Sequence, residues 1–164
     1  MTKHYSWDDG AESAVAHLAM FAAEYHRDDE IFTPIFGALG EYVKGNFRNE
    51  HRADAQAVQL MQRAGIAALQ VLYESEPFAY KHIVETLIKK QHDYGHRNIL
   101  TFGLAGVAVR LCDKIARMEN LVKRGTEAQN EALTDTYMDI VGYAAIALML
   151  EDGSFELELE QDGK

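Results

Sequence analysis

Proline is nearly absent from this chain of 164 residues, which contains only Pro34 and Pro77. Apolar residues recur at intervals of three and four rather than two, the spacing of an amphipathic helix. We therefore predict an all-α fold, a bundle of five to six helices in a single domain. The expected helices cover residues 9–27, 34–44, 50–73, 75–91 (with Ser75 as its N-cap), 99–123 and 127–151.

The two ends of the chain are expected to lie outside this bundle. We divide the sequence into a flexible N-terminus at 1–10, the helical domain at 11–151 and a C-terminal tail at 152–164. The tail alternates apolar and acidic residues, a period of two that is typical of a strand. Its apolar positions are Phe155, Leu157 and Leu159. This pattern predicts a short β-strap onto a partner, or else a disordered tail.

Composition argues against several classes of function. The formal net charge of −10 and the pI near 5.1 disfavour nucleic-acid binding, because the chain repels a polyanion. The single cysteine, Cys112, excludes an intrachain disulfide and a cysteine-based zinc site. The first ten residues show no signal peptide, and no window approaches the ~20 continuous apolar residues of a membrane span. We expect a soluble, cytoplasmic protein that binds no membrane.

The last predicted helix changes character along its length. Up to Asp139 its apolar residues form one face, whereas beyond Asp139 it is apolar on all sides. Such a segment is buried on several sides within its own fold or lies in a subunit contact. The second alternative leads us to expect a homo-oligomer, at least a dimer.

The last two predicted helices also carry charged stripes opposite their apolar faces. The stripes are Arg110, Asp113, Arg117 and Asn120 on the first helix, and Glu131, Asp135 and Asp139 on the second. At ~100° per residue, neighbouring carboxylates of the second stripe are close enough to share a cation. One interpretation puts Mg²⁺ on these carboxylates and phosphate on nearby cations. The other is a salt-bridge ladder in which Arg110, Lys114 and Arg117 neutralise the acids directly.

A polar segment at 92–98 separates two of the predicted helices and contains further candidates. Tyr94 could stack on a base, and Asp93 could ligate a metal or read a base edge. Lys90 and Arg97 could meet phosphates. The alternative is an ordinary loop capped by Asp93 and Gly95. A zinc site on the two histidines of this segment is a weak signal, because Gly95 argues against a continuous helix between them.

Three short motifs follow one another in the second half of the chain. They are Lys90-Gln91-His92-Asp93-Tyr94-Gly95, then Arg110-Leu111-Cys112-Asp113-Lys114 with Arg117, then Glu131-Ala132-Leu133-Thr134-Asp135-Thr136 with Asp139 and Tyr143. Together they resemble the nucleotide-modification-associated domain that is often found in phage genomes. That family is itself similar to the MazG-like all-α nucleoside triphosphate pyrophosphohydrolases. The resemblance covers about residues 80–150, the family-like core of the predicted domain.

The resemblance implies a helical bundle, commonly oligomeric, that binds a nucleotide through Mg²⁺ and cleaves between the α- and β-phosphates. It implies Glu131, Asp135 and Asp139 as metal ligands, with Asp113 as a further ligand or water-orienting group. The catalytic set is then Asp113, Glu131 and Asp135. The nucleotide contacts are then Lys90, Asp93, Tyr94, Arg97, Arg110, Lys114 and Arg117. A metal-bound water would attack phosphorus while the cations stabilise developing charge.

The chain departs from the pyrophosphohydrolase pattern at its acidic positions. That family pairs E-x-x-E on one helix with E-x-x-D on the next, whereas here the first helix offers only Asp113 among basic residues. The first hypothesis is a Mg²⁺-dependent, pyrophosphohydrolase-like protein of phage origin, acting in the host cytoplasm. The alternative is a non-catalytic protein that sequesters a cyclic or ADP-ribose-derived nucleotide signal for a phage. A third possibility is a structural helical oligomer whose stripes are salt bridges.

Overall fold

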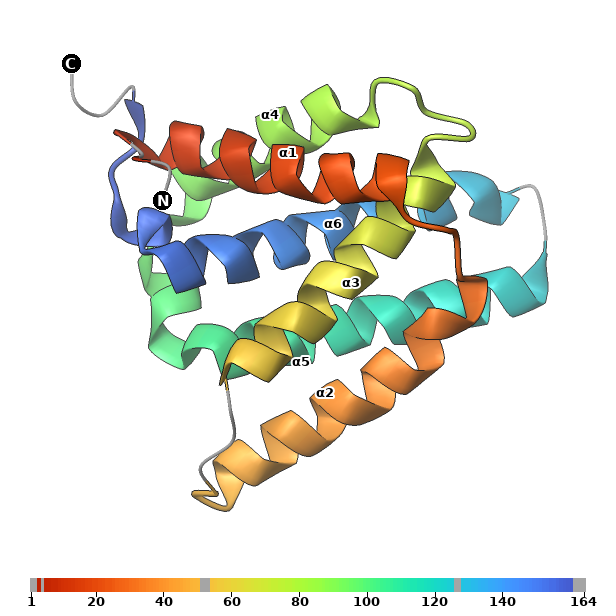
Figure 1. Cartoon of the computed structure of the whole chain (residues 1–164), viewed down its shortest axis with the longest axis horizontal. Helices are drawn as coiled ribbons and strands as arrows, with labels where there is room; N and C mark the ends of the chain where they lie inside the picture. The colour runs from red at the N-terminus through yellow and green to blue at the C-terminus, as the bar shows by residue number, and fades with distance from the viewer. Residues whose placement is uncertain (1–2, 4, 51–53, 126–127, 161–164) are drawn as a thin grey trace.

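The computed structural model describes residues 3, 5–50, 54–125 and 128–160 (Figure 1). Within them the chain forms six α-helices, two short 3₁₀ helices and no strand, which confirms the predicted all-α bundle. The α-helices are α1 (Trp7–Glu24), α2 (Phe32–Phe47), α3 (Asp54–Leu72), α4 (Ala79–Tyr94), α5 (Arg97–Arg124) and α6 (Ala128–Asp152). The 3₁₀ helices are η1 (Asp29–Ile31) and η2 (Ser154–Glu156).

Helix α6 runs through the centre of the bundle and packs against α1, α3, α4 and α5 (Figure 1). Its second half is buried inside the chain, with no exposed surface at Ile140, Val141, Ala144, Ala145, Ala147 and Met149. Burial on several sides therefore explains why this helix is apolar all round, and no subunit contact is needed for it. The homo-oligomer stays a prediction.

The same helix is the one candidate for a membrane span in the described part of the chain. Asn130–Asp152 is long and apolar enough by length and composition, and 56% of its most apolar window is buried inside the bundle. That burial is typical of the core helix of a soluble protein.

Small residues allow α3 to cross α6 at short range. A Cβ added at Gly65 would lie 2.5 Å from the Cβ of Ala144, a separation that Cβ atoms essentially never show. Ala64 and Ala68, on either side of Gly65, are fully buried as well. Close packing of the two backbones, rather than an unusual φ angle, therefore requires glycine at this position.

Two glycines with positive φ shape the helices on either side of the 92–98 segment. Gly95 (φ 69°) follows Tyr94, the last residue of α4. The helix therefore ends three residues later than its predicted end at residue 91. Gly103 (φ 59°, ψ −148°) has a non-helical backbone inside α5, so the predicted helix at 99–123 is in fact two helical pieces joined at a kink. Glycine reaches this region of backbone space without the steric cost that a Cβ adds.

Residue Ser75 does not cap α4 as the sequence suggested. Its N–H donates to the carbonyl oxygen of Leu72 at 3.1 Å and so belongs to the turn that ends α3. Helix α4 starts only at Ala79, after Pro77, and residue Phe78 at its N-cap position makes no side-chain capping bond.

The described residues near both ends pack onto the bundle, whereas we expected a flexible N-terminus at 1–10 and, at 152–164, a strap onto a partner or a disordered tail. Residues 1, 2, 4 and 161–164 of these two segments lie outside the described part of the chain. Helix α1 begins at Trp7, which is 1% exposed, and Ser6 caps it. The predicted β-strap instead forms η2 and an extended segment that makes no strand ladder. The N–H of Trp7 donates to the carbonyl oxygen of Glu158 at 2.8 Å. Phe155 and Leu159 are buried, so the period-two pattern marks a face covered by this same chain.

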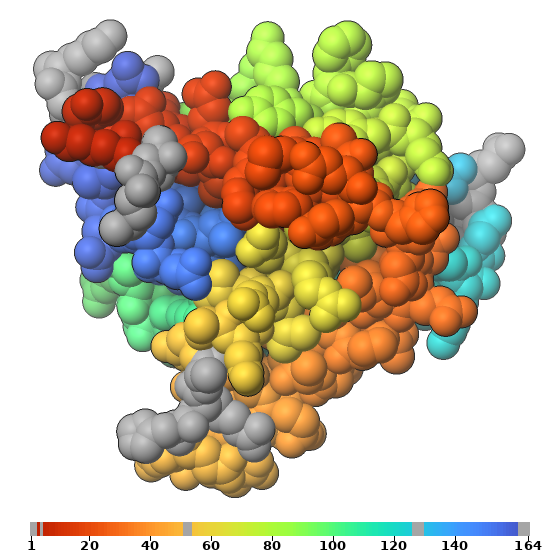
Figure 2. All heavy atoms as spheres, viewed as in Figure 1, coloured from red at the N-terminus to blue at the C-terminus, as the bar shows by residue number. Residues whose placement is uncertain are grey.

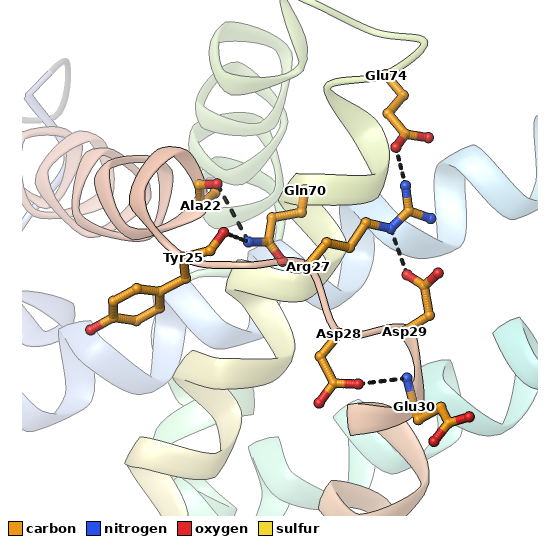
Figure 3. Close-up of polar contacts among 8 residues, drawn as sticks. All are labelled: Ala22, Tyr25, Arg27, Asp28, Asp29, Glu30, Gln70 and Glu74. Atoms are coloured by element: carbon orange, nitrogen blue, oxygen red, sulfur yellow. Dashed lines mark hydrogen bonds and ion pairs between the residues drawn. The ribbon is translucent and has the colours of Figure 1, made fainter.

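A cluster of polar contacts fixes the connection between α1 and η1 onto α3 (Figure 3). The side-chain amide of Gln70 donates to the carbonyl oxygen of Tyr25 at 2.8 Å, and Arg27 forms ion pairs with Asp29 and Glu74. On the face shown in Figure 2, the side chains of α1 lie directly against those of α3 and α4. Helices α1, α3 and α4 therefore cover α6 from one side.

Candidate functional site

A cavity of about 390 Å³ lies between α4 and α6, with one contribution from α5. Helix α4 lines it with His82, Ile83, Thr86, Leu87 and Lys90, α5 with Arg117, and α6 with Asp135, Met138, Asp139, Gly142, Tyr143 and Ile146. We call it the central cavity. It brings together Lys90, Arg117, Asp135 and Asp139, four of the residues that the sequence nominated.

The carboxylate of Asp139 is the most strongly engaged group in this cavity. Lys114 Nζ lies 2.9 Å from its Oδ2 atom, and Lys90 Nζ lies 3.4 Å from its Oδ1 atom. The Asp139 side chain is 26% exposed, so its carboxylate is partly desolvated. A partly buried carboxylate needs cations or donors, and here the two lysines supply them. At this position the salt-bridge interpretation holds.

Two charged groups of the central cavity have no such partner. Within the described part of the chain, neither Arg117 nor Asp135 forms an ion pair, and both are exposed. An unpaired guanidinium can offer two parallel N–H groups to a phosphate or carboxylate. An unpaired carboxylate can accept hydrogen bonds from hydroxyl or amino groups of a ligand.

The predicted Mg²⁺ site on Glu131, Asp135 and Asp139 does not fit this arrangement. No three carboxylate, histidine or cysteine side chains are grouped as metal ligands among the described residues. Each oxygen of Asp139 already faces a lysine ammonium, which repels a divalent cation. The charges of this arrangement therefore suit a phosphate anion better than a metal ion.

The remaining acid of the stripe, Glu131, lines a second and larger cavity of about 770 Å³. This cavity lies between the end of α3, the start of α4 and the first half of α6. It shares His82, Asp135 and Met138 with the central cavity, so the two adjoin. We call it the Glu131 cavity.

A third cavity of about 320 Å³ adjoins the central cavity at its other end. The two share Leu87, Lys90, Tyr143 and Ile146. This third cavity contains Tyr94 and Arg110, two further residues that the sequence nominated, together with Trp7 from α1 and Phe155 from η2. We call it the Trp7 cavity, and the three together form one groove along α4 and α6.

Four nominated residues line none of these cavities. Asp93, Arg97 and Asp113 are exposed, and the fourth, Lys114, contacts Asp139 without lining a cavity itself. Sequence reasoning also missed residues that do line the groove. The four-residue spacing of His82, Thr86 and Lys90 puts them on one polar face of α4 and could have identified that wall. No signal in the sequence associated Trp7 with this region.

The thiol of Cys112 takes no part in the groove. Burial, and then the nearby charge of Asp113, raise its pKa to about 11. A thiol with so high a pKa is protonated at neutral pH and is a poor nucleophile.

Comparison with known proteins found one family model that matches this region. Residues 90–150, less than half of the chain, match the family model described as "Nucleotide modification associated domain 1". No curated protein and no solved structure matches the chain. The matched segment contains four charged residues that line the central cavity, Lys90, Arg117, Asp135 and Asp139, and it contains Lys114, which pairs with Asp139.

Proposed function

We propose that this protein binds a nucleotide in the groove along α4 and α6 and holds its phosphates on Lys90, Lys114 and Arg117. One observation carries the proposal. Lys90 and Arg117 come from different helices and line the same cavity, while Lys114 contacts Asp139, which lines that cavity too. The match of residues 90–150 to a nucleotide-modification-associated domain supports this choice of ligand.

The chemistry of these side chains suits a phosphate. The guanidinium of Arg117 has the fork geometry for bidentate bonds, and the ammonium of Lys90 adds a mobile point charge. Lys90 is 55% exposed, and its contact with Asp139 is long, at 3.4 Å. The Lys90 ammonium can therefore turn from this carboxylate to a ligand. Such local cations matter because the chain as a whole carries a charge of −10 and repels anions at longer range.

Binding without cleavage is the activity that this arrangement supports best. The carboxylates that would hold Mg²⁺ do not form a ligand set, and the most buried of them is neutralised by lysine. The protein then acts by sequestering its ligand, a nucleotide or nucleotide-derived signal. Pyrophosphohydrolase activity is the second candidate. It is favoured by Asp135 and Asp139, which stand one helical turn apart in the same cavity.

The decisive experiment separates capture from cleavage. The protein is incubated with nucleoside and deoxynucleoside triphosphates, cyclic nucleotides and ADP-ribose, with and without Mg²⁺, and then denatured. Mass spectrometry of the released ligands should recover one of them unchanged and enriched. Monophosphate and pyrophosphate that form only with Mg²⁺, and that Asp135→Asn abolishes, would establish the hydrolase instead.

A pair of variants tests the phosphate contacts directly. Arg117→Met removes the charge-assisted hydrogen bonds of the guanidinium and should weaken nucleotide binding about 10- to 100-fold. Calorimetry measures this affinity. Arg124→Met is the matched control, because Arg124 lies two turns further along α5, is exposed and lines none of the three cavities. Equal affinities for the two variants would contradict the assignment.

A further inference from the structure

Three residues that line the Trp7 cavity each have a buried side-chain polar atom without a hydrogen-bond partner among the described residues. The atoms are Trp7 Nε1, Gln91 Nε2 and Asn98 Oδ1. Trp7 is 1% exposed and Gln91 6% exposed, so bulk water does not reach these groups freely. Buried donors and acceptors are normally paired, and each unpaired one costs stability. Three of them around one cavity indicate that a polar ligand completes this site.

The position of the cavity suggests which part of a ligand it takes. It adjoins the central cavity and shares Lys90 and Tyr143 with it, so one small molecule can extend from one into the other. Its volume of about 320 Å³ lies within the range of roughly 300–1,000 Å³ that is typical of small-molecule sites. We infer that the Trp7 cavity binds the base of the nucleotide, an inference that rests on the proposed phosphate site.

The polar groups define the edge that a base must present. With the amide orientations of the structure, Trp7 and Gln91 each offer an N–H donor and Asn98 offers a carbonyl acceptor. Their complement is an edge with two acceptors and one donor. The Watson–Crick edges of thymine, uracil and cytosine have two acceptors and one donor. That of adenine has one acceptor and one donor, and that of guanine has one acceptor and two donors. Tyr94, 69% exposed at this cavity, can stack on the ring.

Trp7 is the only tryptophan of the chain, so its fluorescence reports on this cavity alone. We would titrate the protein with dTTP, dCTP, dGTP and inorganic tripolyphosphate. The first two should change the Trp7 emission saturably, and dGTP should bind about tenfold more weakly. Tripolyphosphate should displace dTTP while leaving the emission of the free protein unchanged.

Two variants separate the base from the phosphates. Gln91→Met keeps the volume of the side chain but removes its donor, and should weaken dTTP about tenfold without changing the affinity for tripolyphosphate. Tyr94→Ala, at an exposed position that cannot disturb the core, should weaken the binding of dTTP several-fold. This variant tests the inference even if Gln91→Met does not fold.

The outcomes that contradict this inference differ from those that contradict the proposed function. Equal affinities for dTTP and tripolyphosphate, with unchanged Trp7 emission, would overturn the base site and leave the phosphate site standing. A change of emission with tripolyphosphate alone would overturn it as well. Failure of every nucleotide and of tripolyphosphate to bind would overturn the phosphate site, and the base site with it.

Discussion

Lys114 Nζ lies 2.9 Å from Asp139 Oδ2 across the contact between α5 and α6. The two side chains are 25% and 26% exposed, far less than in the surface pair of Lys81 and Glu85, where the exposed fractions are 80% and 63%. Lys90 adds a contact from α4. A single carboxylate therefore links three helices in the wall of the proposed phosphate site.

Asp139→Asn should have two effects of opposite sign. It should lower the free energy of unfolding by about 1–2 kcal/mol, between the values for exposed and buried ion pairs. It should also raise the affinity for tripolyphosphate several-fold, because both lysines become available to the anion. Denaturant unfolding and calorimetry measure the two quantities.

The surface variant Glu85→Gln is the matched control and should change stability by less than ~0.5 kcal/mol. A loss of tripolyphosphate affinity in Asp139→Asn would count against direct competition between Asp139 and phosphate. It would support a role for this carboxylate in holding a cation.

Gly65→Ala should destabilise the protein although alanine is the better helix former. The added methyl group would lie 2.5 Å from the Cβ of Ala144, so α3 and α6 must move apart, at a cost of about 1–3 kcal/mol. Gly37→Ala on α2 is the control, since a Cβ there meets nothing within 4 Å. It should stabilise by up to ~1 kcal/mol. A shift of the melting temperature in the same direction for both variants would contradict the packing argument.

Phe155→Ala should release the C-terminal segment from its packing against the helical bundle. Phe155 is fully buried, and its ring centroid lies 5.9 Å from that of Trp7 in an edge-to-face arrangement. Truncation should cost about 3–5 kcal/mol, and the Trp7 emission should shift to the red as water enters. Phe78, 82% exposed, provides the control, because Phe78→Ala should change neither quantity appreciably. A stable Phe155→Ala protein with unchanged emission would show that the segment is not anchored there.

The thiol of Cys112 should be unreactive in the folded protein. Burial and Asp113 raise its pKa to about 11 from an ordinary value of 9.0, so folding favours the protonated form. Its contribution to stability is therefore complete below pH 9.0 and is lost as the pH rises through about 11. At neutral pH the thiolate fraction, and hence the rate with a thiol reagent, should be about 100-fold lower than in the unfolded chain. Equal rates in native buffer and in denaturant would contradict this.

Local patterns in the sequence were sufficient for most of the helices. The helical spacing of apolar residues and the scarcity of proline predicted the all-α bundle. The wrong predictions of helix boundaries lie at positions where two local sequence rules conflict. Ser75 has the chemistry of an N-cap but ends the preceding turn, and Gly103 breaks a helix whose apolar spacing continues through it.

Sequence reasoning identified only some of the residues that line the groove. Lys90, Arg117, Asp135 and Asp139 were nominated and do line one cavity, whereas Asp93, Arg97 and Asp113 were nominated and lie exposed outside the groove. Helical periodicity says which face of a helix a residue occupies, but it does not say which other helix that face meets. His82, on the polar face of α4, was overlooked for that reason.

By itself, the sequence determined the helical fold, the central apolar helix and the set of charges available to a ligand, because these follow from residue type and spacing along one helix. Tertiary structure placed Lys90 and Lys114 beside Asp139, since that depends on three helices meeting. It also brought Trp7 beside Gln91 and Asn98, residues more than eighty positions away in the chain. Contacts between distant segments arise from packing of the whole core, and no local pattern encodes them.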